Sequence, residues 1–399
     1  MAPVSPTNAV PLSRLMRPRD PDEPHRIATP LELFFDLVFV VAIASAAAQW
    51  HHGIAEGHLR DLIGFLMAFF AIWWAWMNYT WFASAYGCDD VVYRVLTFVI
   101  MTGSLMLAAG IPDLFDDGQS GLVVAGYAVM RLAMVAFWLR AAGADEAGRS
   151  TALRYAVGIA AVQLFWIWRL VVEDQAWRYG TFAIGIVLEL LVPVVAERGR
   201  RTPHHPHHIT ERYALFTIIV LGEVILASVQ AVQGALESGV TGDLLGVILG
   251  GLLVVYSLWW IYFKRDHLEL FEGPLRHNLL AGYGHFAVFA SVAATGAALA
   301  ASVDLATHEA HASSRLVGLA LAGAIAVYLT TLGVFHAVAD GRAGSALSAL
   351  VTAGSVVVAA LLGPSIGVTA LLIGLVLATA VAQHVWSTST RDDVVASPG

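Results

Sequence analysis

Residues 31–49 read LELFFDLVFVVAIASAAAQ, an apolar run whose ionisable residues are Glu32 and Asp36. A bilayer core needs roughly 17–25 apolar residues in one helix, so this run predicts a membrane-spanning helix. The two carboxylates are four residues apart and lie on one face of that helix, within its first two turns. They either bind a cation or pass protons inward, or they favour the helix N-terminal dipole and pair with Arg94 or Arg276.

The whole chain has the composition of a membrane protein. Of its 399 residues, 58% are hydrophobic and 13% are charged, whereas a soluble globular protein has about 25% charged residues. We therefore predict an all-α fold, a polytopic membrane bundle of about twelve transmembrane helices. The predicted spans cover residues 31–49, 61–82, 94–111, 121–141, 153–172, 179–196, 213–232, 243–263, 278–301, 315–338, 346–363 and 366–386.

The arginines predict how these helices are oriented. With the N-terminus in the cytoplasm, most arginines fall in cytoplasmic loops and tails, and the opposite side receives Arg60, Arg169, Arg178 and Arg315. Cytoplasmic loops carry an excess of positive charge, so both termini are predicted to be cytoplasmic. Residues 1–30 lack the apolar region of a signal peptide, so the first helix would direct insertion. The Ala-, Gly-, Val- and Arg-rich composition is typical of a high-GC bacterium, which predicts the cell (inner) membrane.

Patterns of several protein classes do not occur in the sequence. One cysteine, Cys88, excludes an internal disulfide and a cysteine-based zinc cluster. There is no P-loop, Rossmann fingerprint, nucleophile elbow or haem motif, so no cofactor is predicted. Nothing indicates nucleic-acid binding. The expected partners are the lipid bilayer and an unknown small solute, ion or lipid-like substrate, and the sequence leaves a homo-oligomer open.

An ordered succession of a glutamate, a tryptophan pair and an arginine occurs twice, at an offset of roughly 180 residues. The members are Glu32, Trp73–Trp74 and Arg94, then Glu211, Trp259–Trp260 and Arg276. The recurrence predicts two parallel six-helix repeats with a site near their interface at the membrane midplane. The predicted parts are an N-terminal tail (1–30), a first repeat (31–197), a cytoplasmic His/Pro-rich linker (198–212), a second repeat (213–387) and a C-terminal tail (388–399).

Residues 210–230, TERYALFTIIVLGEVILASVQ, place Glu223 near the centre of a second long apolar run. At 1.5 Å per residue this carboxyl lies roughly 15 Å into its helix. A charge at that depth costs at least ~2.5–3.5 kcal/mol unless it has a partner or a task. One interpretation is a protonation site in a proton-coupled carrier, and the other is a neutral, hydrogen-bonded Glu that holds helices together.

Three further ionisable residues fall inside predicted spans. Glu189 and Arg131 either pair with each other, or Arg131 serves Glu223. An arginine stays protonated, so a structural ion pair is the favoured role of Arg131. His285 either relays protons or is a packed, hydrogen-bonded core residue.

Polar clusters in the loops allow additional interpretations. Asp89 and Asp90 either hold Mg²⁺ on a diphosphate or cap the following helix. Histidine-rich stretches at 51–58 (HHGIAEGH) and 202–210 (TPHHPHHIT) allow a weak transition-metal site, and the alternatives are an ordinary loop and a flexible linker. No metal site is predicted from them.

Four motifs together resemble those of the bacterial low temperature requirement protein A (LtrA) family. They are ELFFDLVFV near the N-terminus, WWAW, ERYALFTIIVLGE at mid-chain and LWWIYF after it. The resemblance extends from about Thr29 to the last predicted span. It implies a multi-pass membrane topology and supplies no substrate.

The leading functional hypothesis is transport of a small solute or ion, coupled to protons. Glu223 would be the protonation site, and Glu32 and Asp36 would be inner-side cation or gating carboxylates with Arg94 and Arg212 as charge partners. The first alternative is a membrane-embedded enzyme acting on a lipid or isoprenoid-like substrate near the headgroup level. The second alternative is a membrane stress factor without catalytic turnover.

Overall fold

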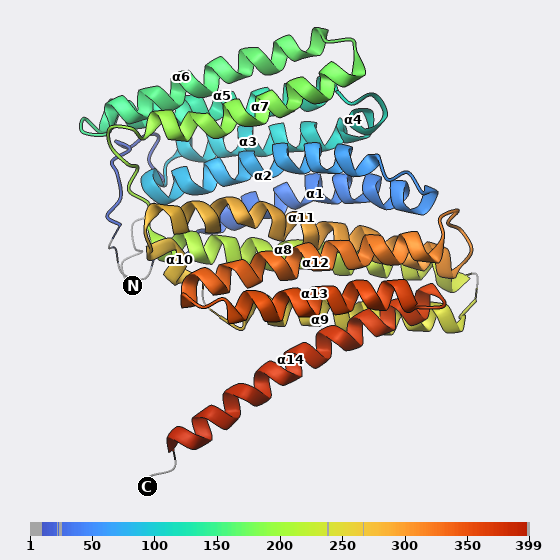
Figure 1. Cartoon of the computed structure of the whole chain (residues 1–399). Helices are drawn as coiled ribbons and strands as arrows, with labels where there is room; N and C mark the ends of the chain where they lie inside the picture. Colours follow the sequence, from blue (N-terminus) through green and yellow to red (C-terminus); the bar gives the residue numbers. More distant parts are fainter. Residues whose placement is uncertain (1–9, 22, 24–25, 238, 266, 397–399) are drawn as a thin grey trace, which may run out of the picture. The chain divides into compact units, whose positions relative to one another are not determined.

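The computed structural model describes residues 10–21, 23, 26–237, 239–265 and 267–396. Within these ranges the chain is all-helical, with fourteen α-helices, one 3-10 turn and no strand. Twelve of the described helices are long and apolar enough to cross a membrane, which confirms the predicted fold class. Figure 1 shows the course of the helices along the chain. The elements are α1 (Pro30–Glu56), α2 (Asp61–Tyr86), α3 (Val91–Ala109), α4 (Ile111–Asp117), α5 (Gly121–Ala144), α6 (Arg149–Trp168), η1 (Arg169–Val171), α7 (Gln175–Ala196), α8 (Pro206–Glu237), α9 (Gly242–Phe263), α10 (Leu268–Glu272), α11 (Leu275–Ala306), α12 (Ser314–Asp340), α13 (Gly344–Leu362) and α14 (Ile366–Ala396).

Helix starts follow local side-chain chemistry. Asp90, Ser120 and Asp174 accept hydrogen bonds from backbone N–H groups in the first turns of α3, α5 and α7. Thr241 and Ser313 do the same for α9 and α12. Such caps satisfy N–H groups that have no partner inside the helix.

The predicted linker and tails differ from the observed helices. α8 begins at Pro206, so Pro206–Arg212 is helical rather than part of a linker. Proline suits the first position of a helix because it needs no hydrogen-bonded N–H there. α14 likewise continues to Ala396 through most of the predicted C-terminal tail. Residues 1–9 and 397–399 of the predicted tails lie outside the described residues.

The chain forms two compact units that are not contiguous in sequence. Unit one comprises the chain up to Ser45 and Phe70–Arg212, and unit two comprises Ala46–Phe69 and the chain from Tyr213 onward. Helices α1, α2 and α8 each contribute to both units. The units therefore do not coincide with two consecutive sets of six helices, and the parallel six-helix repeat stays a prediction.

Unit one packs neighbouring helices in chain order, with α5 against α3 and α6, and α6 against α7. An aromatic cluster stabilises this packing. The rings of Trp138 and Tyr155 stack with centroids 4.1 Å apart, and Phe82 meets Trp138 edge-on at 4.8 Å. The outward face of α1 in this unit is apolar, because Phe34, Leu37 and Val41 are about half exposed. Exposed apolar side chains on one helix face are expected where lipid replaces water.

Unit two is built around α11, the span with the largest buried share among those described. α11 packs against α12, α12 against α13, and α14 against both α13 and α9. The α9–α14 contact depends on small residues, which let two membrane helices approach closely. A Cβ atom added at Gly250 would lie 2.3 Å from the Ala370 carbonyl carbon, whereas one at Gly251 would meet Leu299 at 3.5 Å.

This contrast predicts that Gly250→Ala destabilises the protein and Gly251→Ala does not. The clash at Gly250 is with backbone of α14, which must shift, and overpacking of this kind costs about 1–3 kcal/mol. At Gly251 the added methyl makes an ordinary contact, and alanine is the better helix former. Thermal unfolding of the two detergent-solubilised variants tests this. Equal stability of the two variants would contradict the assigned contact.

Candidate functional site

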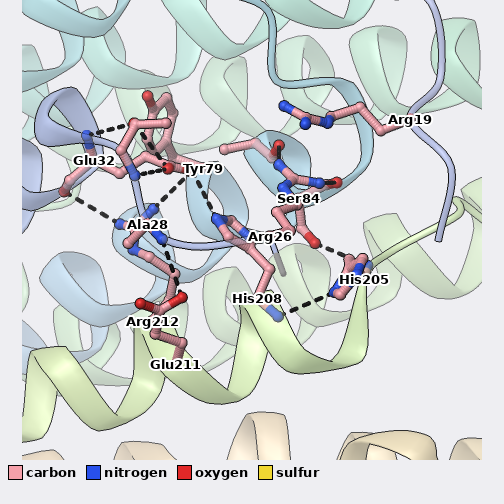
Figure 2. Close-up of polar contacts among 12 residues, drawn as sticks. Arg19, Arg26, Ala28, Glu32, Tyr79, Ser84, His205, His208, Glu211 and Arg212 are labelled. Atoms are coloured by element: carbon pink, nitrogen blue, oxygen red, sulfur yellow. Dashed lines mark hydrogen bonds and ion pairs between the residues drawn. The ribbon is translucent and has the colours of Figure 1, made fainter. Parts of the chain in front are cut away.

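A buried charge cluster joins the start of α1 to the start of α8 within unit one. We define it as Glu32, Asp36, His208 and Arg212, whose side chains are almost entirely excluded from solvent. The Arg212 Nη2 and Nε atoms donate to the two Asp36 carboxylate oxygens at 2.5 and 3.2 Å. The Arg212 Nη1 atom lies 3.2 Å from the Glu32 Oε1 atom. One guanidinium therefore contacts both of the carboxylates that the sequence places on one face of α1. Figure 2 shows Glu32 and Arg212 of this cluster.

Both carboxylates also have partners other than Arg212. The Trp76 indole N–H donates to Asp36 Oδ1 at 2.7 Å. The backbone N–H and the hydroxyl of Thr29 donate to Glu32 Oε2 at 2.8 and 2.9 Å. The His208 Nε2 atom lies 3.1 Å from Glu32 Oε1. Buried carboxylates require this degree of pairing, because an unpaired buried charge is strongly unfavourable.

With both carboxylates ionised, the charges of the cluster balance when His208 is protonated. Glu32 and Asp36 contribute two negative charges when ionised, and Arg212 contributes one positive charge. His208 is the cluster's other potential cation, and it is the side chain type whose charge changes near neutral pH. Glu211, next to Arg212 in sequence, is not part of this ion pairing and accepts instead from the Ala28 backbone N–H at 3.0 Å.

Matching sequence patterns position the acidic and the basic side of the cluster. α1 begins Pro30-x-Glu32-x3-Asp36, and α8 begins Pro206-x-His208-x3-Arg212. Residues four apart lie on one helix face, so each helix presents two ionisable groups at the same distance from its initiating proline. Asp36 and Arg212 are 176 residues apart, and so are Glu32 and His208.

The N-terminal segment covers this end of unit one. Arg26 donates to the backbone carbonyls of Ala83 and Ser84 in the last turn of α2, where unpaired carbonyls are expected. Burial lowers the pKa of Arg26 to about 10, and the group remains a cation at neutral pH. The His205 backbone N–H also bonds the Ser84 hydroxyl at 2.9 Å. Figure 2 shows Arg26 directed toward α2 beside the first turn of α8.

The predicted partnership of Arg94 with Glu32 and Asp36 is wrong. Arg94 instead bonds the exposed Asp89 carboxylate at 2.7 Å, on the loop before α3. Arg276, offered as an alternative, is exposed. The predicted spans place both arginines near the membrane level of the two carboxylates, but membrane level does not determine which helices pack together.

A second buried cluster surrounds Glu189 of α7, also in unit one. Arg131 and Trp74 donate to Glu189 Oε2 at 2.7 and 2.9 Å. Tyr127 and Trp166 donate to Oε1 at 2.8 and 3.1 Å. Arg131 therefore pairs with Glu189, the first of the two partners that the sequence offered. Glu189 and Arg131 are both fully buried, so four donors from three other helices converge on one carboxylate at membrane depth.

Asp89 and Asp90 are engaged in structural contacts. Asp90 caps α3 through the Tyr93 N–H at 2.7 Å, accepts from the Arg14 N–H at 2.7 Å and bonds Arg140. Burial alone would raise the pKa of Asp90, but these donors outweigh it and hold that pKa below its ordinary value. The Asp90 carboxylate is therefore used as a cap and ion-pair partner, which is the alternative to a diphosphate site.

In unit two, His285 is fully buried and both of its ring nitrogens have partners. Its Nδ1 lies 2.6 Å from the Ala281 carbonyl, which can only accept, so Nδ1 carries the hydrogen. Its Nε2 then accepts from the Tyr262 hydroxyl at 3.0 Å. This geometry describes a hydrogen-bonded core histidine, and a relay role for it stays a prediction.

Glu223 differs from the paired acids. It is half-buried in unit two, and the described residues give it neither an ion pair nor a hydrogen bond. A charged carboxylate that is buried inside a membrane span without a partner is energetically costly, as predicted from the position of Glu223 in its apolar run.

The first histidine-rich stretch was predicted as a loop, but its residues 51–56 are the end of α1. His51 bonds Asp304 at 2.6 Å, and Glu56 bonds His311 at 3.1 Å. Among the residues that the structure describes, no group of three His, Cys, Asp or Glu side chains is arranged to hold a metal ion.

Apolar helices of membrane length and ion pairs buried between them define a multi-pass helical membrane protein. The family model for the bacterial low temperature requirement A protein (LtrA) matches residues 27–385, so the chain belongs to this family, as its motifs predicted. It is 28% identical over 277 residues to the uncharacterized protein RA0937 of Rhizobium meliloti (strain 1021), covering 65% of this chain and 66% of that protein. The chain thus spans just under two thirds of that relative's length. No solved structure matches it.

Proposed function

We propose that this LtrA family membrane protein transports a small solute or ion and that Glu223 is its protonation site. The supporting observation is the contrast among its membrane-depth acids. Asp36 and Glu189 each form an ion pair with an arginine and accept hydrogen bonds from Trp or Tyr side chains. Glu223, in contrast, has no partner among the described residues. An unpaired acid within a membrane span is a functional candidate, because protonation is the available way to remove its charge.

In this proposal the charge cluster holds the start of α8 against α1, and Glu223 is the group that binds and releases the proton. Both lie on α8, where Glu223 follows Arg212 by eleven residues, or about 16 Å along the helix. Arg212 ties the start of α8 to α1, and protonation of His208 would balance the cluster's charge. We place the charge cluster on the cytoplasmic side of the inner membrane because the arginine distribution favours cytoplasmic termini.

The test is proton flux in liposomes. The purified protein is reconstituted, a pH gradient is imposed, and flux is recorded with a pH-sensitive dye for wild type, Glu223→Gln and Glu309→Gln. Glu309 is an exposed loop acid, so its variant controls for loss of a carboxylate. We expect Glu223→Gln to reduce flux at least about tenfold, because a Gln cannot carry a proton, and Glu309→Gln to match wild type.

Two results would contradict the proposal. Equal flux for wild type and Glu223→Gln removes Glu223 from the mechanism. No flux above protein-free liposomes, under a pH gradient of either sign and with each candidate solute supplied, would contradict proton-coupled transport and favour the enzyme alternative. The Asp90 carboxylate does not favour the enzyme alternative, because it is already bound by Arg140 and by backbone N–H groups.

A further inference from the structure

Unit two contains a long apolar groove that the transport proposal does not use. Its walls come from the end of α1, the start of α2 and the facing sides of α11 and α12. It has a volume of about 780 Å³, within the range of small-molecule binding sites. Phe65, Phe286, Ala290 and Val327 represent its lining, which is apolar over most of its length.

The mouth of the groove is held in place by hydrogen bonds. The Ala55 carbonyl at the end of α1 accepts from the backbone N–H groups of His311 and Ala312, at 3.0 and 2.9 Å. His51 of α1 bonds Asp304 of α11 at 2.6 Å. The loop between α11 and α12 is thereby fixed to α1, so the groove is preformed, which reduces the entropy lost when a ligand binds.

The charge of the groove is concentrated at this mouth. Arg315 lines it from the first turn of α12, is exposed, and forms no ion pair with a described residue. The N-terminus of α12 adds the partial positive charge of its helix dipole at the same place. The groove therefore combines one cationic end with an apolar interior.

The dimensions match one leaflet of a bilayer. Arg315 and Val327 both line the groove and are twelve residues apart on α12, or about 18 Å along the helix. Half of a hydrocarbon core is about 15 Å. A chain that enters at the membrane boundary beside Arg315 would thus reach the bilayer midplane within the groove.

We propose that this groove binds an acyl chain of an anionic phospholipid, with the lipid phosphate at Arg315. The apolar walls replace the chain's contacts with neighbouring lipids, and the guanidinium pairs with the phosphate. The site is independent of Glu223, which does not line the groove.

Two pairs of variants test the site. Gly323 lines the groove, and a Cβ atom added there meets no heavy atom within 4 Å, so Gly323→Leu would place its side chain in the lipid's space. Gly354 of α13 is equally open but lies away from the groove, so Gly354→Leu is the matched control. Arg315→Gln removes the cation, and Arg342→Gln removes an exposed arginine at the other end of α12.

Lipid occupancy is measured by native mass spectrometry of the full chain in detergent, titrated with phosphatidylglycerol or phosphatidylcholine. We expect wild type, Gly354→Leu and Arg342→Gln to retain one phosphatidylglycerol in preference to phosphatidylcholine. Gly323→Leu should lose the bound lipid. Arg315→Gln should lower the affinity for phosphatidylglycerol about fivefold, as expected for one arginine at a membrane surface. Equal retention of the two lipids by wild type, or equal occupancy in the two glycine variants, would overturn the proposal. Melting temperatures of the two glycine variants, compared without added lipid, separate lipid loss from misfolding.

Discussion

Arg212→Met is expected to destabilise unit one by about 3–5 kcal/mol, the range for removing one partner of a buried ion pair. The substitution keeps a long side chain but leaves the fully buried Asp36 with the Trp76 N–H as its remaining donor among the residues that the structure describes. Glu32 loses a cation as well, although Thr29 and His208 still contact it. Lysine should rescue little, because a point charge cannot reproduce the fork that bonds both Asp36 oxygens.

Equilibrium unfolding in mixed micelles measures this effect. Arg94→Gln is the control, since Arg94 forms an ion pair with Asp89 that is exposed to solvent, and such pairs contribute at most about 1 kcal/mol. The double variant Asp36→Asn with Arg212→Met should be more stable than the sum of the single effects predicts, because it leaves no buried charge on either side of that pair. Similar losses for Arg212→Met and Arg94→Gln would show that the cluster does not stabilise the fold.

Glu189→Gln is expected to cause a loss of similar size, about 3–5 kcal/mol. The two Glu189 oxygens accept from four donors. A Gln amide replaces one oxygen with an NH2 group, which is itself a donor. Whichever way the amide points, its NH2 group would face two of these donors, and Arg131 would remain as a buried cation without a carboxylate.

A double-mutant cycle tests this assignment. Arg131→Met and Glu189→Met are each expected to be severe, whereas the double variant should be less destabilised than the sum of the two. Replacing both members of a buried ion pair with apolar residues removes both charges together. Additive losses would mean that Arg131 and Glu189 act independently, in conflict with their 2.7 Å contact.

Most of the fold could be predicted from hydropathy. Each predicted span overlaps an observed long helix, because a helix that crosses lipid must satisfy its own backbone and needs a minimum apolar length. The start of α8 was missed since histidines and a proline resemble a loop. Proline is compatible with a first helical position, and the Pro206-x-His208-x3-Arg212 spacing, which repeats that of α1, was the available signal.

The candidate site was predicted in part. Ionisable residues inside apolar runs are expected to have partners. The structure buries four of them in ion pairs: Glu32, Asp36, Glu189 and Arg131. His208 and Trp76 were not predicted as their partners. Trp76 lies in a Trp-rich tract with no local sign of a carboxylate partner, and the packing of α2 beside α1 directs its N–H to Asp36.

The sequence by itself determined the medium in which this protein folds, the number of its spans and the positions of its buried charges. These depend on local composition, because the energy of placing a residue in lipid is a property of that residue and its depth. The tertiary structure alone decided that Arg212 rather than Arg94 meets Asp36. It also decided that Glu189 is enclosed while Glu223 has no partner among the described residues. Such pairings depend on which helix faces come into contact, and residues 176 positions apart carry no local signal of that contact.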